Sequence, residues 1–242
     1  MKRDVDALDA MPNLPTLFFE TAQARMRKPF LWHKIDGAYQ SRTYRQTMDE
    51  VIHLARSLKD LGIAPGDRVV ICAENRPEWA IADIAIMALG AIAVPAYTTN
   101  TTTDHMHILS NSAAKGAIVS TRELAKKLLP AAIDSGTCAF VASIEPLLIR
   151  QKLPLDVHAY EALIAHGKEL KDDVVETARQ LGRETTSCII YTSGTGGTPK
   201  GVELSHGAIL CNAAGAYDVL KDGWSVGEEV FLSFLPMTHS YE

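Results

Sequence analysis

One segment of the sequence combines the residue types that bind phosphate. It runs from Tyr191 to Gly201, reads "YTSGTGGTPKG", and holds four glycines, four serine or threonine residues and one lysine. Glycine lets backbone N–H groups approach a ligand closely, and successive N–H groups can curl into an anion-binding nest. The hydroxyl groups are further donors, and Lys200 adds a positive charge. The apolar run "CII" directly before the segment predicts a buried strand. We therefore predict a polyphosphate-binding loop that follows a buried strand.

Two well-known phosphate loops can be tested against this segment. The Walker A pattern needs Gly, four residues and then Gly-Lys-Ser/Thr, but counting from Gly194 places Pro199 and Gly201 at two of those positions. The dinucleotide-binding fingerprint needs a glycine where Pro199 stands and should open a helix directly. Neither pattern fits. A plain surface loop without a ligand remains the alternative.

The elements that must position this loop alternate between strand and helix. Apolar runs at 68–73, 91–97, 116–120, 138–143 and 187–190 predict strands, and 75–90, 102–112 and 121–129 predict helices. Asn75 stands near the cap of the first of these helices, with Pro77 in its first turn. Strands that are apolar on both faces and alternate with helices indicate an α/β fold, a mostly parallel sheet flanked by helices.

Local signals predict further elements. Asp36-Gly37 between two short runs indicates a hairpin, and Thr43 with Gln46 forms a capping box for a helix that ends before Gly62. We expect surface helices at 159–167 and 171–182 and a short strand and a helix after the loop. The run "EVFLSFLP" (229–236) predicts a buried strand.

Composition excludes several classes of protein. The 242 residues carry a net charge of −5, which is unlike the basic footprint of a nucleic-acid partner. The four cysteines are far apart and indicate free thiols in a reducing cytosol. The longest apolar stretch, Trp79–Ala96, predicts a buried helix and strand and not a transmembrane segment. His105 and His107 are two residues apart on a predicted helix and cannot face one metal ion.

The loop and three other stretches resemble a known family. "YTSGTGGTPKGVELSH" is similar to the phosphate-binding signature of the adenylate-forming superfamily, whose usual form TSGTTGxPKG differs from it at Gly196. Residues 61–97 and 102–120 resemble the early segments of acyl-CoA synthetases. "FLSFLPMTHSYE" (231–242) resembles the next core motif and is most like that of long-chain fatty-acid–CoA ligases.

The resemblance implies a reaction and its site. Such enzymes use ATP to convert a carboxylic acid into an acyl-adenylate, which CoA converts into a thioester, with Mg²⁺ carried by ATP. The implied phosphate-binding residues are Thr192, Ser193, Gly194, Thr195, Gly196, Gly197, Thr198 and Lys200. His239 and Tyr241 match positions beside the acyl and adenylate pocket, whereas His206 is expected to cap or pack a helix. We predict no catalytic residue and no protein metal site within this chain.

The resemblance also implies an incomplete enzyme. Residues 1–242 correspond to the N-terminal part of a large AMP-binding domain, so we expect the chain alone to be inactive. Its expected partners are fatty acid, ATP and CoA, in a cytoplasmic protein for which peripheral membrane contact and a homodimer stay open. The alternatives are a non-catalytic nucleotide-binding or assembly module, and a ligase for an aromatic or other carboxylic acid.

Overall fold

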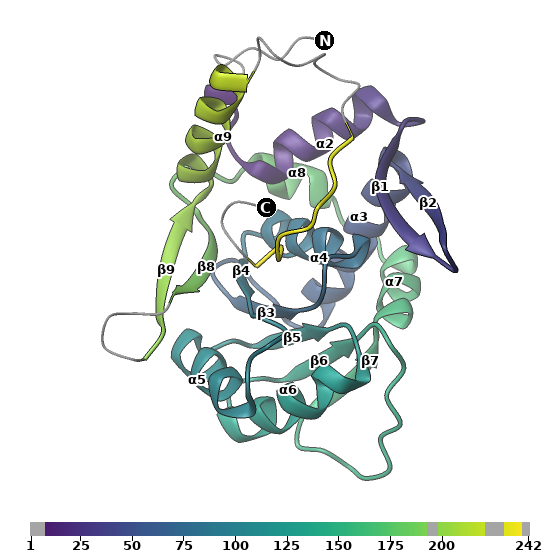
Figure 1. Cartoon of the computed structure of the whole chain (residues 1–242), viewed down its shortest axis with the longest axis vertical. Helices are drawn as coiled ribbons and strands as arrows, with labels where there is room; N and C mark the ends of the chain where they lie inside the picture. The colour runs from purple at the N-terminus through teal and green to yellow at the C-terminus, as the bar shows by residue number, and fades with distance from the viewer. Residues whose placement is uncertain (1–7, 193–197, 221–229, 239–242) are drawn as a thin grey trace.

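The computed structural model of the chain describes residues 8–192, 198–220 and 230–238. Its centre is a seven-stranded sheet in the order β7-β6-β5-β3-β4-β8-β9 (Figure 1). All neighbouring strands are parallel except β8 and β9. The predicted α/β fold with a mostly parallel sheet is therefore confirmed. The strands are β3 (Arg68–Cys72), β4 (Ile92–Pro95), β5 (Gly116–Val119), β6 (Phe140–Ser143), β7 (Asp156–Ala159), β8 (Thr186–Thr192) and β9 (Lys200–Ser205).

Helices cover both faces of this sheet. Alternate residues of β3 point to opposite sides: Val69 and Ile71 pack under α2, α3, α4, α7 and α8, whereas Val70 and Cys72 pack under α5 and α6. Strands buried on both faces lack polar residues for this reason. The helices are α2 (Leu14–Arg25), α3 (Tyr44–Asp60), α4 (Pro77–Ala88), α5 (Thr102–Ser112), α6 (Arg122–Ser135), α7 (Tyr160–Glu169), α8 (Val174–Arg179) and α9 (His206–Leu220).

The predicted hairpin and capped helix both form. Strands β1 (Pro29–Ile35) and β2 (Ala38–Thr43) pair across a turn in which Asp36 has φ 48° and Gly37 has φ 85°. Asn, Asp and Gly tolerate such positive φ values. The capping box of Thr43 and Gln46 then opens α3, so a single local sequence sets the end of the hairpin and the start of the helix.

The long apolar stretch divides into α4 and β4, as predicted. None of the helices in the described ranges is long and apolar enough to cross a membrane. Pro77 opens α4, but its N-cap is Arg76, which makes no side-chain cap bond. The amide of Asn75 instead donates to Ser233 Oγ at 2.9 Å and to the Leu235 carbonyl at 2.6 Å. Asn75 thus holds the segment 230–238 and does not cap the helix.

One strand prediction is wrong, and one strand was missed. The described part of the predicted strand 229–236 has no strand structure, and Val230, Leu232 and Phe234 are each at least 70% exposed. This segment crosses the start of α4, where no described strand offers it a ladder of hydrogen bonds. Conversely, β7 was not predicted, because "DVHA" is short and partly exposed and owes its strand structure to pairing with β6.

Candidate functional site

The glycine-rich segment joins two paired strands. Strand β8 enters from the centre of the sheet, and β9 returns antiparallel along the sheet edge, with Tyr191 opposite Gly201 and Thr192 opposite Lys200. Residues 193–197 connect them and lie outside the described residues, so the predicted roles of Ser193, Gly194, Thr195, Gly196 and Gly197 stay untested. The order of strand, loop, short strand and helix is as the sequence predicts.

The described ends of the loop are open to solvent. Thr192, Thr198 and Lys200 are all exposed. Within the described ranges, no carboxylate lies at salt-bridge distance from Lys200, although nine other ion pairs form there. Lys200 therefore has its charge available for an anionic ligand at the mouth of the loop.

Gly201 has a packing reason to be glycine. A Cβ at this position would lie 2.7 Å from Ile189 Cγ2 and 3.2 Å from the ring of Tyr191. The first distance is shorter than real Cβ contacts and the second is tighter than most of them, so a side chain here would force β8 and β9 to shift. The last glycine of the segment thus lets the two strands approach each other. This packing explains the glycine independently of any ligand.

Helix α5 contacts both ends of the loop. His107 Nε2 lies 2.8 Å from the carbonyl oxygen of Pro199, and the Tyr191 hydroxyl donates to Asn111 Oδ1 at 2.7 Å. The rings of His107 and Tyr191 meet edge to face, with centroids 5.9 Å apart. These contacts were not predicted from the sequence. The only signal for them is that His107 and Asn111 are four residues apart on one predicted helix.

The donor set of the loop suits phosphate better than a metal ion. Hydroxyl groups, backbone N–H groups and an ammonium group donate hydrogen bonds, whereas Mg²⁺ requires oxygen ligands such as carboxylates. Nowhere in the described parts of the chain do three or more His, Cys, Asp or Glu residues come together as a metal site.

The predicted pocket residues His239 and Tyr241 also lie outside the described residues. The two residues before them are described: the Met237 N–H donates to Asn75 Oδ1 at 3.0 Å, and Thr238 is buried. Asn75 therefore bonds to the chain on both sides of Pro236. Its three hydrogen bonds fix the approach of this segment to the start of α4.

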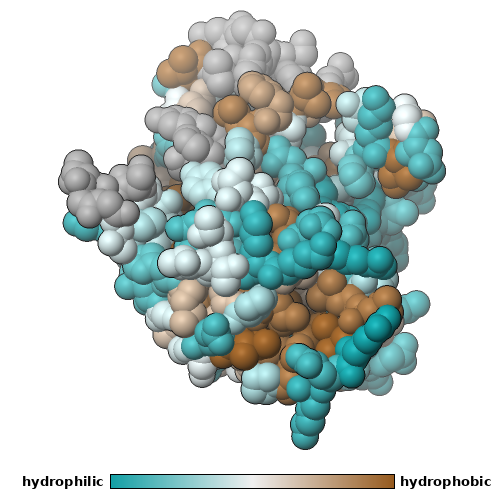
Figure 2. Space-filling model, turned by 60° about the horizontal axis from the view of Figure 1, so that its bottom comes forward, coloured by the Kyte–Doolittle hydropathy of each residue, from teal (hydrophilic) through white to brown (hydrophobic). Residues whose placement is uncertain are grey.

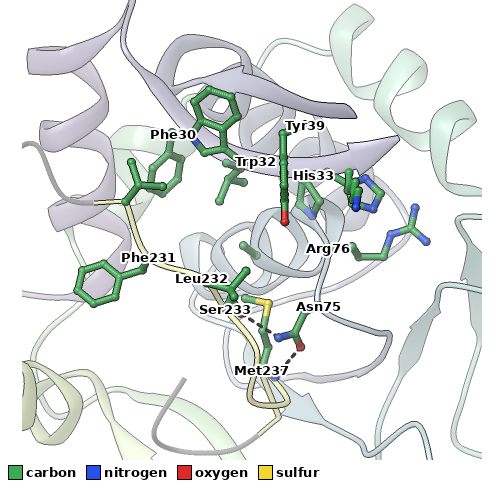
Figure 3. Close-up of a pocket in the computed structure, with 15 residues that line it drawn as sticks. Phe30, Trp32, His33, Tyr39, Asn75, Arg76, Phe231, Leu232, Ser233 and Met237 are labelled. Carbon is green, nitrogen blue, oxygen red and sulfur yellow. Dashed lines mark hydrogen bonds between the residues drawn. The ribbon is translucent and has the colours of Figure 1, made fainter. Parts of the chain in front are cut away.

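A pocket lies between the β1–β2 hairpin and the same segment (Figure 3). It has a volume of about 600 Å³. Trp32 and Tyr39 on the hairpin stand across it from Phe231 and Leu232, with Arg76 beside them. Figure 1 places this hairpin and the paired strands β8 and β9 on opposite sides of the molecule. The described ends of the loop, Thr192 and Lys200, are not among the residues that line the pocket.

A second pocket contains a carboxyl group among apolar side chains. It has a volume of about 400 Å³ and lies between α4, β8 and α9. Asp83 is partly buried in its wall, with Trp79, Cys188 and Ile190 around it. Burial raises the pKa of Asp83 to about 7, because the apolar surroundings disfavour the ionised carboxylate.

Two further histidines, His105 and His206, and one cysteine, Cys72, are buried in the core. His105 is fully buried, and its Nε2 lies 3.9 Å from the Cys72 sulfur. Burial raises the pKa of the Cys72 thiol to about 12 and lowers that of His105 to about 4, so the pair is neutral and not a nucleophile. His206 starts α9, is fully buried and has a pKa lowered to about 4 by burial, which confirms a packing role.

Comparisons with known proteins agree with this architecture. The family of AMP-binding enzymes matches residues 18–242. Long-chain-fatty-acid–CoA ligase FadD15 of Mycobacterium tuberculosis is 34% identical over 207 residues, which are 85% of this chain and 33% of that protein. The A domain of a carboxylic acid reductase from Segniliparus rugosus aligns with 98% of this chain and 43% of its own, with a TM-score of 0.76 and 17% identity. The anthranilate CoA ligase AuaEII aligns with 94% of this chain and 39% of its own, with a TM-score of 0.68 and 22% identity.

These comparisons differ in what they establish. The two structural matches show the fold, because their identities are low. The chain spans about a third of the length of the curated relatives it matches. The family match covers nearly the whole chain and includes the glycine loop, the start of α4 and the segment held by Asn75. The chain therefore belongs to the AMP-binding enzyme family.

Proposed function

We propose that the protein carrying this chain uses ATP to activate a fatty acid, first as an acyl-adenylate and then as an acyl-CoA thioester. The observation that carries the proposal is the glycine loop between β8 and β9, with Lys200 exposed at its end. The fatty acid, as the substrate class, is supported by relatives such as FadD15, whose name states that activity.

The loop has a defined part in this reaction. A carboxylate oxygen attacks the α-phosphorus of ATP, the bond to the bridging oxygen breaks, and pyrophosphate leaves. Phosphoryl chemistry depends on positioning and on neutralising charge. We propose that Thr192, Thr198 and Lys200 hold the β- and γ-phosphates together with the loop residues between them, and that His239 and Tyr241 lie beside the acyl and adenylate groups.

Other parts of the reaction are assigned outside this chain. In the second step the CoA thiolate attacks the acyl carbon and AMP leaves. We assign no catalytic residue within 1–242 and propose that the chain is the N-terminal part of a large AMP-binding domain. Mg²⁺ enters with the phosphates of ATP in this proposal. A cytoplasmic location is favoured by the four free cysteines, while peripheral membrane contact and a homodimer stay predictions.

The substrate class can be tested on the complete reading frame that encodes this chain. We expect palmitate to stimulate pyrophosphate release from ATP and, with CoA, to give palmitoyl-CoA. Anthranilate and benzoate are the matched comparison acids. Activity with these acids and none with palmitate would make the protein an aromatic-acid ligase. ATP binding without turnover on any acid would make it a non-catalytic module.

The assignment of catalytic residues outside the chain has its own test. Residues 1–242 are incubated with palmitate, ATP and CoA, and palmitoyl-CoA is measured by mass spectrometry. We expect no product above a control without protein. Product above that control would show that the chain contains its own catalytic machinery.

A further inference from the structure

We infer that His107 and Asn111 of α5 are positioning residues that anchor the two ends of the phosphate loop and fix the direction of the Lys200 backbone. The anchoring is independent of any ligand. Its consequence for nucleotide binding rests on the proposed function. Neither residue belongs to the glycine-rich segment or follows from its pattern.

The two residues form one contact surface on α5. Residues four apart lie one above the other on the same face of a helix, so His107 and Asn111 face the β8–β9 hairpin together. His107 reaches the β9 end through the Pro199 carbonyl. Asn111 reaches the β8 end through the Tyr191 hydroxyl. Both ends of the loop are therefore attached to the same rigid helix.

The bond from His107 acts on the peptide that carries Lys200. A carbonyl oxygen accepts, so His107 must hold its proton on Nε2 to donate to it. The Pro199 carbonyl and the Lys200 N–H belong to one planar peptide unit and point in opposite directions. Fixing the carbonyl thus fixes the N–H as well, and with it the point from which the Lys200 side chain leaves the backbone.

The anchor also compensates for two weak points of the hairpin. Proline has no N–H, so Pro199 cannot donate to the ladder between the strands. Gly201 has no side chain of its own to pack across the pair that it forms with Tyr191. Edge-to-face contact between the rings of His107 and Tyr191 joins the two hydrogen bonds into one cluster. Both described ends of the loop are therefore held by one cluster of contacts.

The first test measures the anchor without a ligand. Hydrogen exchange of the 242-residue chain is followed by mass spectrometry in the wild type, His107→Ala and His107→Gln. We expect His107→Ala to speed exchange at the start of β9 about 3- to 10-fold, as for a lost hydrogen bond, with α5 and β3 unchanged. His107→Gln, which keeps an N–H donor, should restore most of the protection. Ser110→Ala, an exposed position on the same helix, is the matched control.

The second test measures the consequence for the ligand. We expect His107→Ala to raise the dissociation constant for MgATP about 3- to 10-fold, with a smaller change in His107→Gln and none in Ser110→Ala. Unchanged exchange at β9 in His107→Ala would overturn the anchor. Faster exchange with unchanged MgATP affinity would overturn the positioning role. If the wild type bound no MgATP, the proposed function would be wrong. The hydrogen-exchange experiment would still show whether His107 anchors β9.

A third variant covers the case in which His107→Ala does not fold. Tyr191→Phe removes the hydroxyl that donates to Asn111 and keeps the ring. We expect faster exchange at the end of β8 and weaker MgATP binding in this variant. Wild-type exchange and affinity in a folded Tyr191→Phe chain would contradict the anchor at the β8 end.

Discussion

Lys200 is the residue on which the proposed chemistry depends most. It is exposed at the end of the loop, and no described carboxylate neutralises it. In the complete enzyme, we expect Lys200→Ala to slow adenylate formation by about 10²–10³-fold, the usual effect of removing one donor to a developing charge, with the fold unchanged. Pyrophosphate exchange measures the rate and circular dichroism the fold. Lys126→Ala, an exposed lysine on α6, should change neither; equal rates in the two variants would contradict the role of Lys200.

Asp83 makes stability depend on pH. Its native pKa of about 7 is above the ordinary 3.8, so the native state binds the proton more tightly than the unfolded state. The free energy of unfolding therefore falls as pH rises from about 4 to 7. A pKa difference of this size corresponds to at most about 4 kcal/mol, and the partial exposure of Asp83 to solvent reduces it.

The variant Asp83→Asn removes this dependence. At pH 4.5 and at pH 8 the unfolding free energy of Asp83→Asn is compared with that of the wild type by urea unfolding. We expect this difference to favour the variant by about 1–2 kcal/mol more at pH 8 than at pH 4.5. Asp134→Asn, at an exposed position on α6, should show no such change. If the stability difference between Asp83→Asn and the wild type were the same at both pH values, the carboxyl group would not be held in its neutral form.

At the residue scale, the sequence could predict the chemistry of the loop but not the contacts between residues that are distant in the sequence. The glycine, serine, threonine and lysine residues identified the loop, because these residue types bind phosphate. The roles of Asn75, Asp83, His107 and Asn111 depend on contacts with distant segments. Neither the types nor the spacing of these residues indicates such contacts. All four lie in stretches that were predicted as helices, and only Asn75, near the cap of its helix, was given a role there.

At the element scale, α7 and α3 pack unusually closely. A Cβ on Gly167 would lie 1.8 Å from the carbonyl oxygen of His53, and Ser57 Oγ donates to the Leu163 carbonyl at 2.5 Å. Gly167→Ala must therefore push the helices apart. We expect it to cost about 1–3 kcal/mol of unfolding free energy, as overpacking does.

A glycine on another helix provides the control. A Cβ on Gly215 in α9 meets nothing within 4 Å, so Gly215→Ala should stabilise the chain by about 0.5–1 kcal/mol through helix propensity alone. Urea unfolding of the two variants is the measurement. A Gly167→Ala chain as stable as the wild type would show that α7 and α3 do not approach this closely.

Elements were predictable where local signals set their ends. The turn at Asp36-Gly37, the capping box at Thr43 and the glycine after α3, at Gly62 with φ 91°, all act within a few residues. Strand β7 and the segment 230–238 depend on whether a partner strand is available. That information is not local, which explains why one strand was missed and another was predicted wrongly.

At the scale of the whole molecule, apolar side chains are exposed in two regions. Figure 2 shows hydrophobic residues gathered on the part of the surface that Figure 1 places at the bottom. The second region is formed by the hairpin and the segment 230–238, where Tyr39, Leu232 and Phe234 are all more than half exposed. Exposed apolar surface of this kind promotes association.

We therefore predict that the 242-residue chain self-associates at micromolar concentration. Sedimentation velocity should show species larger than a monomer, and Leu232→Ser combined with Phe234→Ser should reduce them. Val219→Ser, at an exposed position on α9, should have no such effect. A sharp monomer boundary without binding of a hydrophobic dye would show that these side chains are no association surface.

The central claim is that the loop between β8 and β9 binds the phosphates of ATP, and calorimetric titration of the 242-residue chain with MgATP tests it most directly. We predict saturable binding at one site, competed by pyrophosphate. Lys200→Ala should weaken it about tenfold or more, as expected for the loss of a charge-assisted hydrogen bond, while Lys126→Ala leaves it unchanged. Absence of saturable binding in a folded chain, or equal affinity of the wild type and Lys200→Ala, would contradict the claim.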